Sequence, residues 1–156
     1  MVFDRDDIAA AIPPEARLGG RIEVQGGSLF DLAPEGADIY LVIRVSHNWT
    51  DDDCIRILRS CRAAMTPGAR LLIVEQILEP DPALGRPSGY RVDTHMMAMF
   101  GAARERTESD FGERLRSSVF VLERAIQAAS PTGSWRQLRS EQRACAAQCR
   151  RPPWCS

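Results

Sequence analysis

His47 is the side chain in this sequence best suited to take a proton from a substrate. The ordinary pKa of an imidazole lies close to neutral pH, so histidine is a frequent general base in proteins. Glu75 lies late in a separate apolar run, and a carboxylate beside an imidazole fixes the ring and stabilises its positive charge. The two residues favour a general base with a supporting acid. From position alone, however, residues of these types more often have a structural role than a catalytic one. The histidine would then fill a strand-to-helix corner, and the glutamate would be solvated.

Two other groups of residues favour structure over chemistry. The three methionines within residues 96–99 are more typical of core packing than of a soft wall for a flat apolar substrate. Three cysteines lie between positions 145 and 155, but a structural zinc site takes four ligands and no histidine lies near them. We therefore expect no metal site.

The elements that must position His47 form the most clearly specified part of the chain. His47 follows the apolar run Ala37–Val45, which is typical of a strand buried on both faces. Thr50 and Asp53 then have the spacing of a capping box, and apolar residues recur every three or four positions after it. Arg70–Leu78 reads as a second buried strand. Strand, helix and strand at this spacing predict a βαβ unit with parallel strands and a right-handed connection.

Shorter elements are predicted on both sides of this unit. We expect helices over Asp6–Ile12 and Val92–Ala103, a helix that begins at Thr107, strands over Arg21–Val24 and Val119–Ala128, and a loop over Glu79–Gly89. The fold class is therefore α/β with a mostly parallel sheet. Ligands of such sheets bind beyond the carboxyl ends of the strands, where His47 and Glu75 lie.

Composition narrows the classes of partner. The 156 residues fit one domain, and 20 basic against 21 acidic residues exclude a general polyanion binder, so no nucleic acid is expected. No apolar run approaches the roughly 18 residues of a membrane span, and the first residues lack a secretory signal pattern. The cysteine count is odd, at five, and Cys54 and Cys61 have no partner cluster. We expect a reducing, cytoplasmic location and no membrane partner.

Four segments occur in the order and spacing of one protein family: GGSLFDLAPEGADIYL, SHNWTDDDCIRIL, RAAMTPGARLLIVEQIL and VDTHMMAMFGAARERTESDF. With the opening VFD, they make residues 1–133 resemble part of the catalytic domain of the S-adenosylmethionine-dependent small-molecule O-methyltransferases. The likeness is to the caffeate and acetylserotonin type and its bacterial relatives. It implies a Rossmann-like class I methyltransferase sheet, S-adenosylmethionine as cofactor and no metal.

The same resemblance assigns roles to individual residues. It makes His47 the general base and places Glu75 and Glu105 beside the imidazole. It implies methyl transfer to a hydroxyl of a small aromatic molecule. The remaining assignments are Asp4 for the cofactor ribose, Ser28, Leu29 and Arg44 around the adenine, Trp49 packed nearby, and Met96 in the acceptor pocket.

The chain also departs from the family pattern. Asn48 stands where the family has an aspartate beside the base, and Ser28 replaces the acid expected to accept from the adenine amino group. The family's glycine-rich loop and the strand before it are absent, so the chain is expected to be an N-terminally truncated portion with two exposed apolar strand edges. Such a chain would work with a complementing N-terminal portion or as a homodimer. The alternative is a non-catalytic remnant that acts at most as an interaction or dimerisation fragment.

Residues 134–156 have a different character. They are rich in arginine and cysteine and show no sustained apolar periodicity. A segment without periodic apolar positions cannot offset the entropy lost on ordering. We predict an irregular, poorly ordered basic tail where a family member would form another strand.

Overall fold

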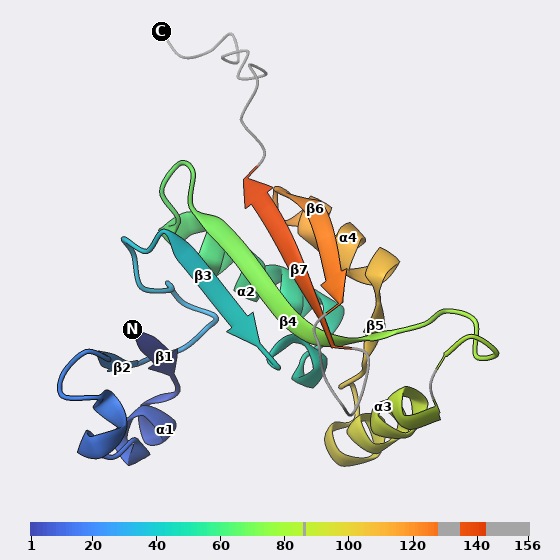
Figure 1. The fold of residues 1–156 in the computed structure, drawn as a ribbon, viewed down its shortest axis with the longest axis horizontal. Coiled ribbons are helices and arrows are strands. Elements are labelled where there is room, and N and C mark those ends of the chain that lie inside the picture. The colour runs from blue at the N-terminus through green and yellow to red at the C-terminus, as the bar shows by residue number, and fades with distance from the viewer. Residues whose placement is uncertain (86, 128–134, 143–156) are drawn as a thin grey trace, which may run out of the picture.

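The computed structural model describes residues 1–85, 87–127 and 135–142, and it has an α/β fold with two sheets (Figure 1). The first part contains β1 (Val2–Asp4), α1 (Asp6–Ala11), η1 (Pro14–Arg17) and β2 (Val24–Gly26). β1 and β2 pair in parallel, with Val2 opposite Val24. β2 therefore lies further along the chain than the predicted Arg21–Val24. The residues before it belong to a turn, in which the Ile22 N–H donates to the Arg17 carbonyl over 3.1 Å.

The larger sheet has the order β3-β4-β7-β6. Its strands are β3 (Ile39–Ile43), β4 (Arg70–Leu78), β6 (Phe120–Gln127) and β7 (Trp135–Gln142), and the short β5 (Arg106–Thr107) pairs with the end of β4. β3 and β4 are parallel, as predicted, and so are β4 and β5. β7 runs antiparallel to both of its neighbours.

The two predicted helix starts are confirmed. α2 (Asp51–Ala64) begins after Thr50, whose hydroxyl accepts the Asp53 N–H over 3.2 Å. α4 (Glu108–Ser117) begins with a complete capping box between Thr107 and Asp110. Each cap supplies an acceptor to a backbone N–H that the helix cannot satisfy internally.

The helix predicted over Val92–Ala103 forms as α3 (Pro87–Phe100), so it begins inside the predicted loop and ends earlier. Proline is well tolerated in the first turn of a helix, because the N–H that it lacks has no intrahelical partner there. Pro87 is therefore a helix start where the sequence pattern indicated a loop.

The prediction of an irregular tail is wrong for Trp135–Gln142, which form β7. This strand lies between β4 and β6 and pairs with both of them. Backbone pairing on two sides lets a strand form without the apolar alternation on which the prediction depended. Residue 134 and residues 143–156 of the predicted tail lie outside the described residues.

The core lies on one face of the larger sheet, beneath α2 and α4. It gathers mainly apolar side chains from both helices and from the facing side of the strands, among them Tyr40, Leu58, Cys61, Leu71, Ile73, Ile77, Phe111, Leu115 and Phe120. Figure 1 shows α2 and α4 behind the sheet, with no described helix over the side of β3 and β4 that faces the viewer. Ile39, Leu41 and Ile43 of β3 point to that side, and each is more than half exposed.

A cavity of about 420 Å³ separates the two sheets. Phe3 of β1, Leu29, and Tyr40 and Leu41 of β3 contribute to its walls. In the part of the chain that the structure describes, β3 pairs only with β4. None of the helices described is long and apolar enough to cross a membrane.

Candidate active site

The parallel strands β3 and β4 end beside a buried histidine. The chain leaves β3 and forms the short turn η2 (Ser46–Asn48), which carries His47. The Nδ1 atom of His47 lies 3.0 Å from Oε2 of Glu75, and the Ser46 N–H donates to the other oxygen of Glu75 over 2.8 Å. Glu75 has no exposed surface. The predicted pairing of these two residues is therefore present, and one carboxylate holds both the ring and the backbone of the turn.

Arg44 joins this pair through an unusual backbone conformation. Its N–H donates to the Val74 carbonyl over 3.1 Å, and its φ of 52° lies in the left-handed region. That region costs a residue with a side chain on the order of 1–3 kcal/mol, and such residues cluster at functional sites. The guanidinium donates to Oε1 of Glu105 over 2.9 Å and lies 3.6 Å from Oε2 of Glu75. Arg44 thus bridges the two acids.

Glu105 reaches the same cluster from a distant part of the chain. It lies just before β5, and its backbone N–H donates to Oδ1 of Asp93 in α3 over 2.7 Å. Burial raises the pKa of the Glu105 carboxyl, while the hydrogen bond from Arg44 opposes that shift. His47, Glu75 and Glu105, each predicted from the sequence, converge in the fold; we call them, with Arg44, the acid–base cluster.

The contacts of Glu75 decide which ring nitrogen of His47 holds its proton. The Glu75 carboxylate lies 3.6 Å from the Arg44 guanidinium and 3.0 Å from Nδ1 of His47. Oε2 of Glu75 faces both Arg44 and Nδ1, and a carboxylate in that position accepts. The Nδ1 atom therefore carries the proton, which leaves the Nε2 lone pair as the acceptor.

The same donors have the chemistry of a metal site, since one ligand atom from each of His47, Glu75 and Glu105 lies within 4.8 Å of the others. Arg44 contacts both acids, so the protein itself supplies a cation to the carboxylates.

The residues predicted to hold a cofactor are more dispersed. Asp4 is exposed at the end of β1, where its carboxylate accepts the Arg5 N–H over 2.8 Å. The Ser28 hydroxyl accepts the Phe30 N–H over 3.2 Å, and Leu29 lines the cavity between the sheets. The geometry places Arg44 against the acids, whereas it was predicted at the adenine with Ser28 and Leu29.

Two aromatic rings connect this loop to the histidine turn. Phe30 packs edge-on against Trp49, with 4.7 Å between the ring centroids. Trp49 directly follows η2, so the segment that contains Ser28 lies beside the residues that carry His47. Met96, predicted in the acceptor pocket, is buried on α3, which packs against β4 and η2.

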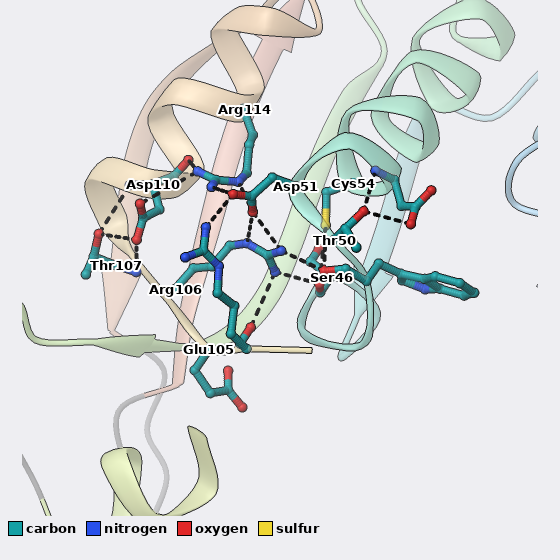
Figure 2. Close-up of polar contacts among 12 residues, drawn as sticks. Ser46, Thr50, Asp51, Cys54, Glu105, Arg106, Thr107, Asp110 and Arg114 are labelled. Atoms are coloured by element: carbon teal, nitrogen blue, oxygen red, sulfur yellow. Dashed lines mark hydrogen bonds and ion pairs between the residues drawn. The ribbon is translucent and has the colours of Figure 1, made fainter. Parts of the chain in front are cut away.

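The most buried cation of this region was missed by the sequence analysis. Arg106 is 1% exposed and forms an ion pair with Asp51, the first residue of α2 (Figure 2). Arg114 of α4 binds the same carboxylate. Arg106 directly follows Glu105 within the family-like segment VDTHMMAMFGAARERTESDF, so its place beside a predicted acid was the signal that could have found it. Asp51 is one of three acids whose position already suits the helix dipole.

Comparison with known proteins gives consistent matches. The family model of the O-methyltransferase domain matches residues 1–121. A mitomycin biosynthesis 6-O-methyltransferase of Streptomyces lavendulae is 39% identical over 109 residues, which are 70% of this chain and 30% of that protein. The crystal structure of LaPhzM superposes with a TM-score of 0.80 at 33% identity, over 90% of this chain and 42% of that one.

A third similar structure contains ligands. NcsB1, an O-methyltransferase from neocarzinostatin biosynthesis, was solved with S-adenosyl-L-homocysteine and 1,4-dihydroxy-2-naphthoic acid. It has a TM-score of 0.74 and 28% identity, over 90% of this chain and 41% of that one. The chain thus spans well under half of the length of these relatives, between 30% and 42%.

Proposed function

The chain belongs to the O-methyltransferase domain family, and from this premise we propose that it carries the acid–base half of an S-adenosylmethionine-dependent O-methyltransferase. The acceptor is the hydroxyl of a small aromatic molecule, and His47 is the general base. The observation that carries the proposal is the buried hydrogen bond of 3.0 Å between Nδ1 of His47 and Glu75. A buried imidazole with one nitrogen held by a carboxylate is the arrangement that a general base needs.

Each member of the acid–base cluster has a distinct task in this proposal. Nε2 of His47 takes the proton of the acceptor hydroxyl as its oxygen becomes the nucleophile. Glu75 keeps the proton of the ring on Nδ1 and stabilises the imidazolium that results. Arg44 donates to Glu105 over 2.9 Å and holds this second acid near the ring, so that it adds to the same stabilisation. A positioned base of this kind contributes about 10²–10⁴-fold to the rate.

The residues at the ends of β1 and β2 suit a nucleoside in part. Asp4 offers a carboxylate acceptor of the kind that ribose hydroxyls require, and Leu29 with Phe3 offers an apolar wall. Ser28 can accept one hydrogen bond but brings no charge. When bound, S-adenosylmethionine supplies a methyl group on a cationic sulfur, which the acceptor oxygen takes in one displacement.

The test is the identity of the methylated atom. The purified 156-residue chain is incubated with S-adenosylmethionine labelled in its methyl group and with 1,4-dihydroxy-2-naphthoic acid, the compound bound in NcsB1. We expect the label in an O-methyl ether, and none in 2-naphthoic acid, which has no hydroxyl outside its carboxyl group. A set of aminophenols is tested in the same way. Label on their carbon or nitrogen atoms, with none on oxygen, would contradict the proposal.

A second candidate function has its own observation. Ile39, Leu41 and Ile43 are exposed apolar residues on one strand, and such a surface is typical of an association site. An interaction or dimerisation role without catalysis predicts that Leu41→Asp weakens self-association in sedimentation analysis, while His47→Gln changes no measured property of the protein except local structure.

A further inference from the structure

Arg106 contacts both ends of the turn that carries His47. Nη1 of its guanidinium donates to the Ser46 carbonyl over 2.6 Å, and Nη2 donates to the Trp49 carbonyl over 2.7 Å. These two carbonyls bracket His47 and Asn48. Hydrogen bonds from a charged donor are stronger than neutral ones, and the planar guanidinium fixes the separation of its two acceptors.

A carboxylate holds Arg106 in this position. Nε of Arg106 donates to Oδ1 of Asp51 over 3.0 Å, and Nε of Arg114 donates to the same oxygen over 2.8 Å. Arg104 also binds this carboxylate. The hydrogen bond from Arg114, together with that from Arg106, holds the pKa of the Asp51 carboxyl well below its usual range. Figure 2 shows this carboxylate between the arginines, at the start of α2.

The segment that contains Arg106 links the turn to the acid–base cluster. Arg106 directly follows Glu105, and the Arg104 N–H donates to the His47 carbonyl over 3.0 Å. Arg106 itself lies in β5, where it pairs with Ile77 of β4, the strand that carries Glu75. The same three residues therefore supply one acid to the cluster and hold the backbone of the histidine.

We propose that Arg106 is a positioning residue for His47, which acts by bridging the Ser46 and Trp49 carbonyls so that Nδ1 of His47 stays on Glu75. The assignment rests on the proposed role of His47 as the base. Arg106 donates to the turn and to Asp51, so it acts through the backbone of the turn. Lysine cannot replace it fully, because an ammonium on a flexible stem does not hold two acceptors at a fixed separation.

The test follows His47 directly by NMR. The chain has two histidines, so ¹⁵N-labelled histidine reports His47 and the exposed His95 as an internal control. We expect a single His47 tautomer with the proton on Nδ1 in the wild type. Arg106→Met should give a mixture of tautomers and speed amide exchange across residues 46–49 by about tenfold or more, because two charged hydrogen bonds are lost. Arg106→Lys should lie between the two.

Arg59→Met is the matched control, since Arg59 also donates to a backbone carbonyl, that of Ser117, but on the exposed surface. It should leave the tautomer and the exchange at residues 46–49 unchanged. An unchanged His47 tautomer and unchanged exchange in Arg106→Met would overturn the proposal. If that variant does not fold, the same two readouts in Arg106→Lys decide, and wild-type behaviour there overturns it.

Turnover separates this proposal from the proposed function. Arg106→Met should lower kcat for methyl transfer by about tenfold or more while the KM for the acceptor changes little, because the base is displaced and the binding surface is kept. Full turnover in His47→Gln would reject the proposed function, but the NMR results would still decide whether Arg106 positions His47.

Discussion

The acid–base cluster and a second group of residues, Asp4, Ser28, Leu29 and Trp49, both follow the carboxyl ends of parallel strands. We call the second group the cofactor edge, since these residues were predicted to hold the cofactor. The two groups differ in burial and in the number of side-chain hydrogen bonds that hold them. His47, Glu75 and Glu105 are buried, and hydrogen bonds fix the ring and both acids. Asp4 is exposed, and its carboxylate accepts the N–H of the next residue. Ser28 likewise accepts a nearby backbone N–H.

The topology explains this difference. The acid–base cluster comes from β3, β4 and a segment paired to β4, so all of its parts belong to one sheet. The cofactor edge combines β1 and β2 with the turn after β3, and a cavity of about 420 Å³ lies between the two sheets. The βαβ unit and the segment paired with it therefore bring the acid–base cluster together without residues from β1 or β2.

The largest expected difference between the two regions is in stability. Glu75→Leu should lower the free energy of unfolding by about 3–5 kcal/mol, because the Ser46 N–H loses its acceptor and Arg44 loses one carboxylate contact. The matched change Asp4→Leu, at an exposed site, should stay within about 0.5 kcal/mol. Urea unfolding of both variants gives the comparison. Equal losses would show that the Glu75 and Asp4 carboxylates contribute equally to the free energy of unfolding, which would contradict this account.

A change at Ser28 should strengthen the weaker region. Ser28→Asp restores the acid that the family resemblance implies, and a charged hydrogen bond contributes about 1.5–3 kcal/mol, or roughly ten- to hundredfold in affinity. We expect tighter binding of S-adenosylhomocysteine by calorimetry, with Ser28→Asn as the uncharged control. If the aspartate variant binds no better than the asparagine variant, the adenine does not lie at Ser28.

The smallest expected effect concerns the ion pairs that support the acid–base cluster. Asp51 has a folded pKa below the ordinary value of 3.8, chiefly through its hydrogen bond from Arg114. Its stabilisation is therefore present above that value and is lost as the pH falls toward the lower folded pKa. Asp51→Asn should cost about 1 kcal/mol at pH 7, since the carboxylate is 36% exposed and solvent screens it. A cost that persists unchanged at pH 2 would contradict this account.

Sequence patterns were reliable where they depended on local periodicity and capping. β4 has the predicted bounds Arg70–Leu78, and the helices begin after Thr50 and at Thr107 as predicted. The sequence patterns failed where pairing between distant segments decides the structure. Trp135–Gln142 forms a strand because it pairs with β4 and β6, and its sequence lacks the apolar alternation that predicts a strand.

The site shows the same division. Residue chemistry and position indicated His47 and Glu75, the resemblance to the family added Glu105, and the fold brings all three together. The sequence did not reveal that Arg44 bridges the acids or that Arg106 binds the turn. Arginine supplies every basic residue of the chain, so its type carries no signal, and both roles depend on contacts between segments about 60 residues apart.

The central claim is that His47 is the general base. Its most direct test is the turnover of the His47→Gln variant of the 156-residue chain, with a phenolic acceptor at neutral pH. Glutamine keeps hydrogen bonding but cannot act as the base, so methyl transfer should fall by about 10²–10⁴-fold while binding of S-adenosylhomocysteine is retained. Glu75→Gln should be milder, and His95→Gln, a change at the exposed second histidine, should have no effect. Turnover of His47→Gln close to that of the wild type would contradict the assignment of His47 as the base.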